Sequence, residues 1–259
     1  MCGIAGIFSQ RPVASELYDS IIHLQHRGQD AAGIMTYDKR MHKEKGMGLA
    51  KEVFNKENLQ LLKGNIGISH NRYPTHGGFS HGEVQPFWTS VPYGIALAHN
   101  GNLTNYEDLA KEVTKEETRY LNTTSDSEVL LHLFADHLHQ DAPPQNSEDF
   151  FNLLCEAVTS IFNKVKGAYS VTSIIIGKSL VVFRDPQGIR PLVKGERLNK
   201  NGKKEYIFAS ENTMFYPLGF KPKGTVLPGE LIYVDEEGRV FSKRLIKKDF
   251  NPCIFEYVY

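Results

Sequence analysis

The 259-residue sequence has few cysteines, no surplus of charge of either sign and no long apolar run. Lys and Arg total 30 and Asp and Glu total 30, so the formal net charge is +0. This balance argues against nucleic acid as the main partner, because neutralising phosphates requires a cationic surplus. It argues equally against an anionic membrane surface, and no apolar run approaches the roughly 18 residues of a membrane span. We therefore expect neither a nucleic acid nor a membrane partner.

The scarcity of cysteine bears on the cellular compartment. Cys2, Cys155 and Cys253 are too few and too far apart for a disulfide framework. The N-terminus also lacks the cationic start and long apolar stretch of a signal peptide. We expect a reducing, cytoplasmic location. The ten histidines show no metal-binding spacing, so we expect hydrogen-bonded or solvated histidines and no metal site.

What is present is the composition of a globular protein, with 41% apolar and 23% charged residues. Short apolar runs bounded by turn residues predict strands along most of the chain. The predicted strands are Ile4–Phe8, Ala31–Tyr37, Ile66–His70, Tyr93–Ala98, Ala168–Ile176, Leu180–Phe183, Tyr206–Ala209, Leu231–Val234 and Val240–Leu245. The strand ending at Ala98 is followed by His99-Asn100-Gly101, which predicts a sharp turn.

Helices are predicted at four places. Leu17, Ile21 and Leu24 share one face of a helix that Ser15 begins, and Phe151 to Val165 forms an apolar stripe that includes Cys155. Core packing is the expected role of Cys155. Two capping boxes, 104–107 and 125–128, predict two further helix starts. Many strands with two long adjacent helices predict an α+β sandwich rather than alternating βαβ units.

Cys2 is a candidate nucleophile. If Met1 is removed, the thiol and a free α-amino group belong to the same residue. An α-amino group has a pKa of about 7.7–8.0, so a useful fraction is neutral near pH 7 and can accept the thiol proton. The thiolate is the reactive species. Cysteine at position 2 is weak evidence alone, because it also occurs by chance.

Five sequence blocks strengthen this interpretation. They are Met1-Cys2-Gly3-Ile4, 26–33 (HRGQDAAG), 71–75 (NRYPT), 99–105 (HNGNLTN) and 123–128 (TTSDSE). In this order they resemble the class II glutamine amidotransferases, which are N-terminal-nucleophile hydrolases, from Met1 to about Leu245. The resemblance implies an αββα sandwich of two mostly antiparallel sheets between helix layers.

Three further segments resemble the amidophosphoribosyltransferase family within that group. They are 72–75 (RYPT), 183–192 (FRDPQGIRPL) and 251–259 (NPCIFEYVY). Enzymes of that family pass ammonia from L-glutamine to phosphoribosyl pyrophosphate, forming 5-phosphoribosylamine in purine synthesis. The resemblance covers their N-terminal half, and the Asp-Asp motif of their second domain does not occur here. We expect a glutaminase domain over 1–245, with 246–259 beginning a linker to a phosphoribosyltransferase domain.

The resemblance also assigns roles to residues. It implies Cys2 as the nucleophile and the Asn100 side chain with the Gly101 N–H as the oxyanion hole. An Asn-Gly pair is otherwise an ordinary turn signal. Arg72 is expected to bind the α-carboxylate of glutamine and Asp126 its α-ammonium, against the alternatives of a surface ion pair and a favourable charge at a helix start.

Three more residues are assigned to the substrate site by resemblance. Thr75 and His76 are expected along the bound glutamine. Arg27 is expected near the pocket, and the alternative is a structural ion pair. Gly77, Gly78 and Gly82 lie within 72–86, which the resemblance implies is a lid that closes on glutamine.

The resemblance further implies partners and cofactors. No cofactor is expected in this segment, and magnesium is expected in the missing phosphoribosyltransferase domain. Some members of the family carry an iron–sulfur cluster with a ligand equivalent to Cys253, but Met1 directly precedes Cys2 here, which favours the cluster-free type. The full-length protein is expected to form a homo-oligomer.

Two alternative functions stay open. Another class II amidotransferase, of the hexosamine-phosphate or asparagine synthetase type, would share the N-terminal blocks but not the segment ending at Tyr259. A non-catalytic regulatory module would follow if Met1 is retained, because Cys2 would then have an amide nitrogen and no base of its own.

Overall fold

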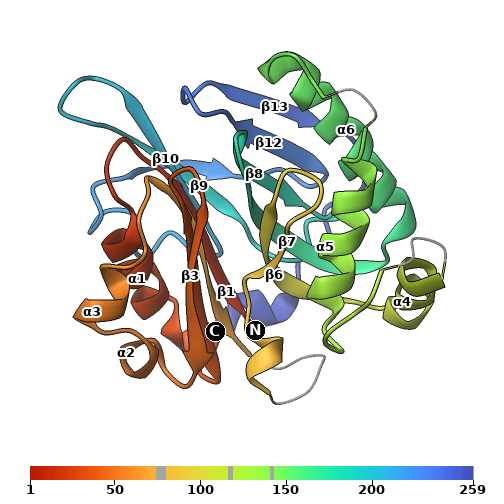
Figure 1. Ribbon diagram of the computed structural model, residues 1–259, viewed down its shortest axis with the longest axis horizontal. Coiled ribbons are helices and arrows are strands. Elements are labelled where there is room, and N and C mark those ends of the chain that lie inside the picture. The colour runs from red at the N-terminus through yellow and green to blue at the C-terminus, as the bar shows by residue number, and fades with distance from the viewer. Residues whose placement is uncertain (74–79, 116–118, 141–142, 259) are drawn as a thin grey trace.

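The computed structural model describes residues 1–73, 80–115, 119–140 and 143–258 of the chain. Two antiparallel sheets pack face to face between two layers of helices (Figure 1). Within the described residues the first sheet has the strand order β11-β9-β10-β1-β4-β2-β3 and the second β13-β12-β8-β7-β6-β5. This is the αββα sandwich that the family resemblance implies.

The strand boundaries follow the apolar runs closely where a strand is buried. The first sheet contains β1 (Gly3–Phe8), β2 (Ala31–Tyr37), β3 (Met41–Met47), β4 (Ile66–Arg72), β9 (Val193–Leu198), β10 (Lys204–Ala209) and β11 (Lys221–Thr225). The second contains β5 (Phe87–Thr89), β6 (Ile95–Leu103), β7 (Gly167–Ile175), β8 (Ser179–Arg184), β12 (Glu230–Val234) and β13 (Val240–Arg244).

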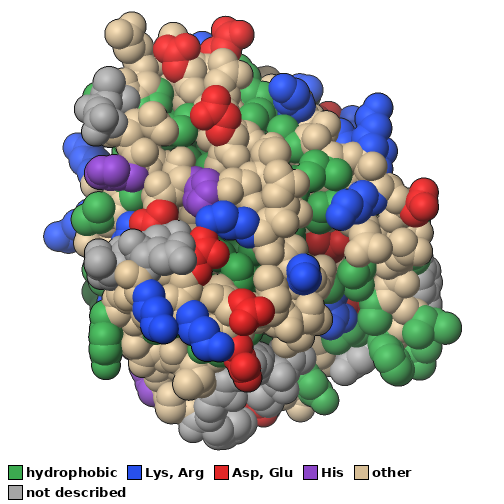
Figure 2. Space-filling view, turned by 90° about the vertical axis from the view of Figure 1, so that its right-hand side faces the viewer, with side chains coloured by type: hydrophobic (Ala, Val, Ile, Leu, Met, Phe, Trp, Pro, Cys, Tyr) green, Lys and Arg blue, Asp and Glu red, His purple; other side chains and the backbone are tan. Residues whose placement is uncertain are grey.

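Helices cover the outer face of each sheet. They are α1 (Ala14–His23), α2 (Ala50–Val53), α3 (Lys56–Leu59), α4 (Tyr106–Lys115), α5 (Asp126–His137) and α6 (Ser147–Lys164), with short 3-10 helices η1 (Gln25–Arg27), η2 (His81–Glu83) and η3 (Ile254–Tyr257). In Figure 1, α1 to α3 lie outside the first sheet, and α5 and α6 outside the second. On the face that carries these latter helices, acidic and basic side chains are intermingled (Figure 2).

Apolar residues form three buried clusters that hold the four layers together. One lies between α1 and the first sheet, and another lies between α5, α6 and the second sheet, where Cys155 is 9% exposed as predicted. The third fills the space between the two sheets, with Ile4 and Ile68 on one side and Ala98 and Ile174 on the other. No helix within the described ranges is both long and apolar enough to span a membrane.

The predicted turn at His99-Asn100-Gly101 is wrong. Strand β6 continues through these residues to Leu103 and pairs with β7 along its whole length, up to the pair Leu103–Gly167. The backbone hydrogen bonds offered by β7 outweigh the local turn preference of Asn-Gly. Gly101 is required in this strand because a Cβ there would lie 1.9 Å from the Ala168 carbonyl oxygen.

The predicted capping box at 125–128 forms only in part. Ser125 is the N-cap of α5, and its hydroxyl accepts from the Ser127 N–H at 3.3 Å. The Glu128 carboxylate reaches outside the helix and accepts from the N–H groups of Asn122 and Thr123 at 3.0 and 2.8 Å. These bonds fix the loop that leads into α5, and so fix where Asp126 begins the helix.

The segment after β13 folds back onto the domain. The Asn251 and Cys253 N–H groups donate to the Gln187 and Ile189 carbonyls at 2.9 and 3.1 Å. The chain then forms the short helix η3. This path brings Glu256 next to the N-terminus of the chain.

Candidate functional site

Strand alternation brings the predicted site residues to one end of the space between the sheets. Ile4 and Ile68 face the second sheet. Cys2, directly before β1, and Arg72, the last residue of β4, lie at even spacing from them and so point the same way. The register Gly3–Asn71 places Cys2 opposite Arg72. From the other sheet, Asn100 follows Ala98 on the face of β6 that meets the first sheet. Cys2, Arg72 and Asn100 therefore converge.

The Cys2 thiol is buried and contacts the backbone. Its side chain is 6% exposed, and Sγ lies 3.4 Å from both the nitrogen and the carbonyl oxygen of Tyr73. Burial raises the pKa of the Cys2 thiol and the negative charge of Asp126 raises it further, whereas the Tyr73 contact and Arg72 oppose this. A buried thiol of this kind needs a nearby base to become a nucleophile.

Met1 covers the nitrogen of Cys2. Met1 is 9% exposed, and the Met1 sulfur contacts a guanidinium nitrogen of Arg190. Burial lowers the pKa of the Met1 α-amino group, although the neighbouring Cys2 raises it. With Met1 attached, the nitrogen of Cys2 is an amide that cannot accept a proton. Removal of Met1 would convert it into the amine that the proposed chemistry needs.

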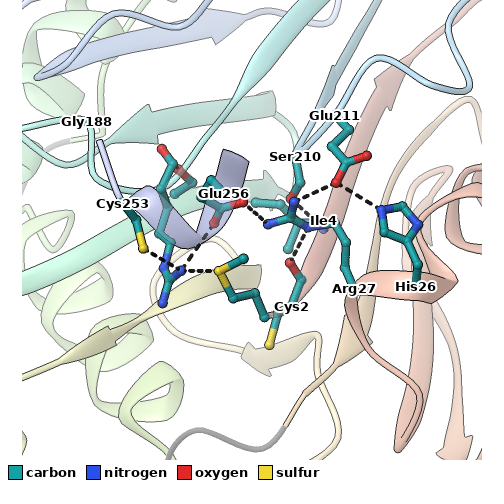
Figure 3. Close-up of polar contacts among 12 residues, drawn as sticks. Cys2, Ile4, His26, Arg27, Gly188, Ser210, Glu211, Cys253 and Glu256 are labelled. Atoms are coloured by element: carbon teal, nitrogen blue, oxygen red, sulfur yellow. Dashed lines mark hydrogen bonds and ion pairs between the residues drawn. The ribbon is translucent and has the colours of Figure 1, made fainter. Parts of the chain in front are cut away.

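Arg27 anchors the backbone of Cys2. Its Nε donates to the Cys2 carbonyl at 3.0 Å, and its two terminal nitrogens bind Glu211 at 2.6 Å and Glu256 at 2.8 Å (Figure 3). The side chain is 1% exposed, and in Figure 3 the sulfur of Cys2 points away from this ion-pair cluster. The arrangement favours the structural ion pair for Arg27. Its predicted contact with substrate stays a prediction.

Asn100 carries a buried side-chain amide. The residue is 1% exposed, and neither its Nδ2 nor its Oδ1 has a hydrogen-bond partner among the described residues. Because buried polar groups are almost always hydrogen-bonded, such a group indicates strain or a function. The predicted role of Asn100 as an oxyanion donor is compatible with this burial and stays a prediction. The neighbouring Gly101 is held tightly, with the Ala168 carbonyl on one side and the His99 ring on the other.

Asp126 lies beside the same strand end. It is the first residue of α5 and 5% exposed, and its Oδ2 accepts from the Leu103 N–H at 3.0 Å. Its Oδ1 lies 3.8 Å from His99 Nδ1. Asp126 raises the pKa of Cys2 and Arg72 lowers it, so both charges act on the thiol. A cation and an anion that both act on one thiol are complementary to the two charged ends of a free amino acid.

Sequence reasoning missed a set of buried polar residues around this strand. His99 Nδ1 lies 3.0 Å from Ser127 Oγ, and the Gln85 carboxamide binds both His99 and Ser127. His70, on β4 between Ile68 and Arg72, is fully buried, and burial with the nearby charges lowers its pKa to about 3. Their contacts join segments far apart in the sequence, so no local motif signals them.

Some predicted features lie on residues that the structure does not describe. Thr75 and His76 lie outside the described residues, as do Gly77 and Gly78 of the predicted lid. Within the described ranges, no group of three His, Cys, Asp or Glu side chains is placed to hold a metal ion. Cys253 lies on the segment that returns to the N-terminus, with its sulfur 3.9 Å from Arg190 Nη1.

Comparison with known proteins places this geometry in context. A family model described as a glutamine amidotransferase domain matches residues 70–217. The chain is 47% identical to the amidophosphoribosyltransferase of Pasteurella multocida and 46% identical to that of Escherichia coli, and each comparison covers 100% of this chain and 51% of the relative. The chain therefore spans about half the length of these curated relatives.

Solved structures of related proteins have a similar fold. The glutamine phosphoribosylpyrophosphate amidotransferase of Bacillus subtilis, solved with ADP and GMP, matches with a TM-score of 0.81 and 31% identity. A structure described as the allosteric regulatory enzyme of purine biosynthesis matches with a TM-score of 0.83 and 32% identity. Both matches cover 100% of this chain and 52% of the other.

Proposed function

Because the chain belongs to the glutamine amidotransferase domain family, we propose that it hydrolyses L-glutamine to glutamate and ammonia through a thioester on Cys2. The observation that carries this proposal is the buried Asn100 amide, which lacks a partner in the described part of the chain and faces the same end of the inter-sheet space as the Cys2 thiol. A nucleophile beside an unused donor is the arrangement that amide hydrolysis requires.

The reaction begins once Met1 has been removed. The free α-amino group of Cys2 takes the thiol proton, and the thiolate attacks the side-chain carbonyl carbon of glutamine. The carbonyl oxygen becomes an oxyanion, which accepts hydrogen bonds from the Asn100 amide and the Gly101 N–H. Collapse of this intermediate breaks the carbon–nitrogen bond, and the protonated amine gives its proton to the departing ammonia. Water then attacks the thioester carbonyl while the amine accepts its proton. The carbon–sulfur bond breaks, glutamate is released, and the expelled thiolate takes the proton back from the protonated amine.

Two charges select the substrate. Arg72 pairs with the α-carboxylate through its planar guanidinium, and Asp126 pairs with the α-ammonium. Both residues are buried, at 4% and 5% exposure, so their electrostatic effect is stronger than at the surface. A glutamine inside a peptide lacks both charges, so the site favours the free amino acid. Thr75 and His76 are proposed to lie along the bound substrate.

The full-length protein is proposed to use the ammonia for a second reaction. Its relatives are amidophosphoribosyltransferases, which supports transfer to phosphoribosyl pyrophosphate to form 5-phosphoribosylamine for purine synthesis. The same resemblance supports a linker from residue 246, a magnesium-dependent phosphoribosyltransferase domain beyond this sequence, a homo-oligomer and a cytoplasmic location. Assaying the full-length protein with phosphoribosyl pyrophosphate, a sugar phosphate and aspartate tests this transfer, and an iron assay tests the expectation that no cluster is bound.

The experiment that tests glutamine hydrolysis compares two cysteine variants. Cys2→Ala should reduce glutamate production to background, whereas Cys155→Ala, on the buried stripe of α6, should retain it. Intact mass before and after a glutamine-analogue alkylating agent reports both removal of Met1 and the labelled residue. Activity of Cys2→Ala near that of the unaltered chain would refute the proposal. Retained Met1 with no activity would favour the non-catalytic module.

A further inference from the structure

Strand β6 has one edge that is only partly paired by another strand. On its β7 side, backbone pairing is continuous from Ile95 to Leu103. On its other side, β5 pairs with residues 95–97 only, and the last of these pairs is Phe87–Leu97. Within the described ranges, no strand continues along this edge beyond Leu97. The part of β6 that carries Asn100 and Gly101 is therefore supported on this side by other means.

The carboxamide of Gln85 occupies the position where the next strand residue would pair. Extending the antiparallel register by two residues from Phe87–Leu97 would place Gln85 opposite His99. The side chain of Gln85, and not its backbone, makes the hydrogen bonds to His99. Oε1 accepts from the His99 N–H at 2.7 Å, and Nε2 contacts the His99 carbonyl at 3.3 Å and Ser127 Oγ at 2.9 Å.

These bonds fix the direction in which Gly101 presents its N–H group. Alternate residues of a strand direct their N–H groups to the same side, so those of His99, Gly101 and Leu103 all point toward this edge. The His99 N–H is bound by Gln85, and the Leu103 N–H is bound by Asp126. The proposed oxyanion donor at Gly101 thus lies between two backbone groups that side chains hold in place.

Gln85 is itself held by the opposite sheet. Lys45 on β3 donates to the Val84 carbonyl at 2.5 Å and contacts the Pro86 carbonyl at 3.4 Å. The Gln85 carbonyl packs so closely on Gly33 of β2 that a Cβ there would lie 2.0 Å from it. The first sheet carries Cys2 and the second carries Asn100, so Gln85 connects the nucleophile's sheet to the donors' strand.

We infer that Gln85 is a positioning residue that sets the oxyanion donors relative to the thiol. The inference rests on the proposed glutamine hydrolysis and goes beyond it, since Gln85 acts through His99 and does not itself touch the reacting atoms. It predicts that loss of the carboxamide lowers the rate of the chemical steps and leaves glutamine binding and the thiol itself largely unchanged.

The test uses two variants that lose the same kind of bond. Gln85→Met removes both hydrogen-bonding atoms at nearly constant shape. Asn105→Leu is the matched control, because the Asn105 amide likewise bonds two backbone groups, the Lys164 carbonyl at 3.0 Å and the Lys166 N–H at 2.9 Å, but lies beyond the end of β6. Both variants are expected to lose stability, and only Gln85→Met should lose rate.

Three measurements distinguish misplaced oxyanion donors from a general loss of structure in the site. For Gln85→Met we expect kcat for glutamine to fall about 10²-fold, the typical effect of a displacement near 1 Å. KM should stay within about threefold, since ground-state binding is retained. Alkylation of Cys2 by iodoacetamide needs no oxyanion donor, so its rate should stay within about twofold. If Gln85→Met does not fold, as judged by circular dichroism, Gln85→Asn replaces it, because it keeps a polar amide that is one methylene too short.

Three results would overturn the inference about Gln85. A kcat equal to that of the unaltered chain overturns the inference, and so does a parallel loss of kcat and iodoacetamide rate or the same kcat loss in Asn105→Leu. These results leave the proposed function intact, provided that the unaltered chain hydrolyses glutamine and Cys2→Ala does not. If the unaltered chain hydrolyses no glutamine after Met1 is removed, the proposed function fails and the inference fails with it.

Discussion

The space between the two sheets has an apolar middle and a polar end, and the same strands supply both. Strand β4 contributes Ile68 to the middle and Arg72 to the end, and β6 contributes Ala98 and Asn100 in the same order. In the middle, apolar side chains are buried among other apolar groups, and Ile68 and Ala98 are 0% exposed. At the end, charged and polar side chains are buried almost as completely.

The difference shows how one scaffold separates stability from chemistry. Apolar burial in the middle stabilises the fold by about 25 cal/mol for each Å² removed from water. At the polar end, a buried amide such as Asn100, with no partner within the described ranges, lowers stability because its desolvation is not compensated. The middle therefore stabilises an end that would not be stable alone, and substitutions in the two regions should act on different quantities.

The largest effect is expected at Asn100. Asn100→Leu removes a proposed oxyanion donor, so kcat should fall by about 10²–10³-fold. Because the amide has no partner in the described part of the chain, the free energy of unfolding should stay the same or rise by about 1 kcal/mol. Glutaminase assays and urea unfolding measure the two quantities. A large loss of stability would mean that Asn100 is a structural residue.

The reverse behaviour is expected in the apolar middle. Ile68 is 0% exposed, so Ile68→Ala should lower the free energy of unfolding by about 2–5 kcal/mol, through lost burial and the cavity left behind. The kcat of the molecules that remain folded should be unchanged. Urea unfolding and assays at a temperature well below the transition provide the check. A fall in kcat without loss of stability would contradict the separation of the two regions.

A charge at the polar end should affect binding more than folding. Asp126→Asn keeps an acceptor for the Leu103 N–H but loses the charge proposed to pair with the substrate ammonium. KM for glutamine should rise about 10- to 100-fold, which corresponds to a hydrogen bond to a charged group. Since Asp126 raises the pKa of the Cys2 thiol, its loss should lower that pKa and accelerate alkylation at pH 8. An unchanged alkylation rate would show that the two groups do not interact.

The smallest effect concerns pH and His70. Its pKa in the folded protein is lowered to about 3, mainly by burial, whereas an unfolded histidine titrates near its ordinary value of 6.5. Below pH 6.5 the unfolded state therefore binds a proton that the folded state does not. Stability should fall with decreasing pH by up to about 1.4 kcal/mol per pH unit.

The measurement compares two proteins, so that other titrating groups cancel. Urea unfolding at pH 7, 6 and 5 should give a steeper loss of stability for the unaltered chain than for His70→Gln. Equal slopes of unfolding free energy against pH would show that His70 takes up a proton in the folded state. They would also show that water reaches the polar end more readily than its burial indicates.

Much of the fold is predictable because a buried strand appears in the sequence as a short apolar run bounded by polar residues. The run Ala31–Tyr37 is β2 with the same boundaries, since all its residues are buried and charged residues, Asp30 and Asp38, flank it. The strands that the sequence did not reveal are β3, β5, β9 and β11. Three of them are rich in lysine and other polar residues, and β5 has only 3 residues. Their pairing depends on neighbours that sequence periodicity does not encode.

The residues of the candidate site are predictable only in part. Cys2, Arg72, Asn100 and Asp126 were assigned by resemblance of sequence blocks, and the fold brings Cys2, Arg72 and Asn100 to one end of the inter-sheet space. Taken singly, each has a commoner explanation. Gln85 gave no signal, because its role arises only when two sheets place it beside His99. The turn predicted at Asn100 failed for a related reason, since tertiary pairing with β7 overrode a local preference.

The outermost strands of the two sheets have a consequence for behaviour at high concentration. The exposed edges of a sheet can recruit strands from other molecules. Here β3 carries Lys43 and Lys45, β11 carries Lys221 and Pro222, β13 ends in Lys243 and Arg244, and β5 has only 3 residues. Each edge thus has a feature that disfavours strand addition, so the long apolar strands inside are shielded from seeding aggregates or fibrils.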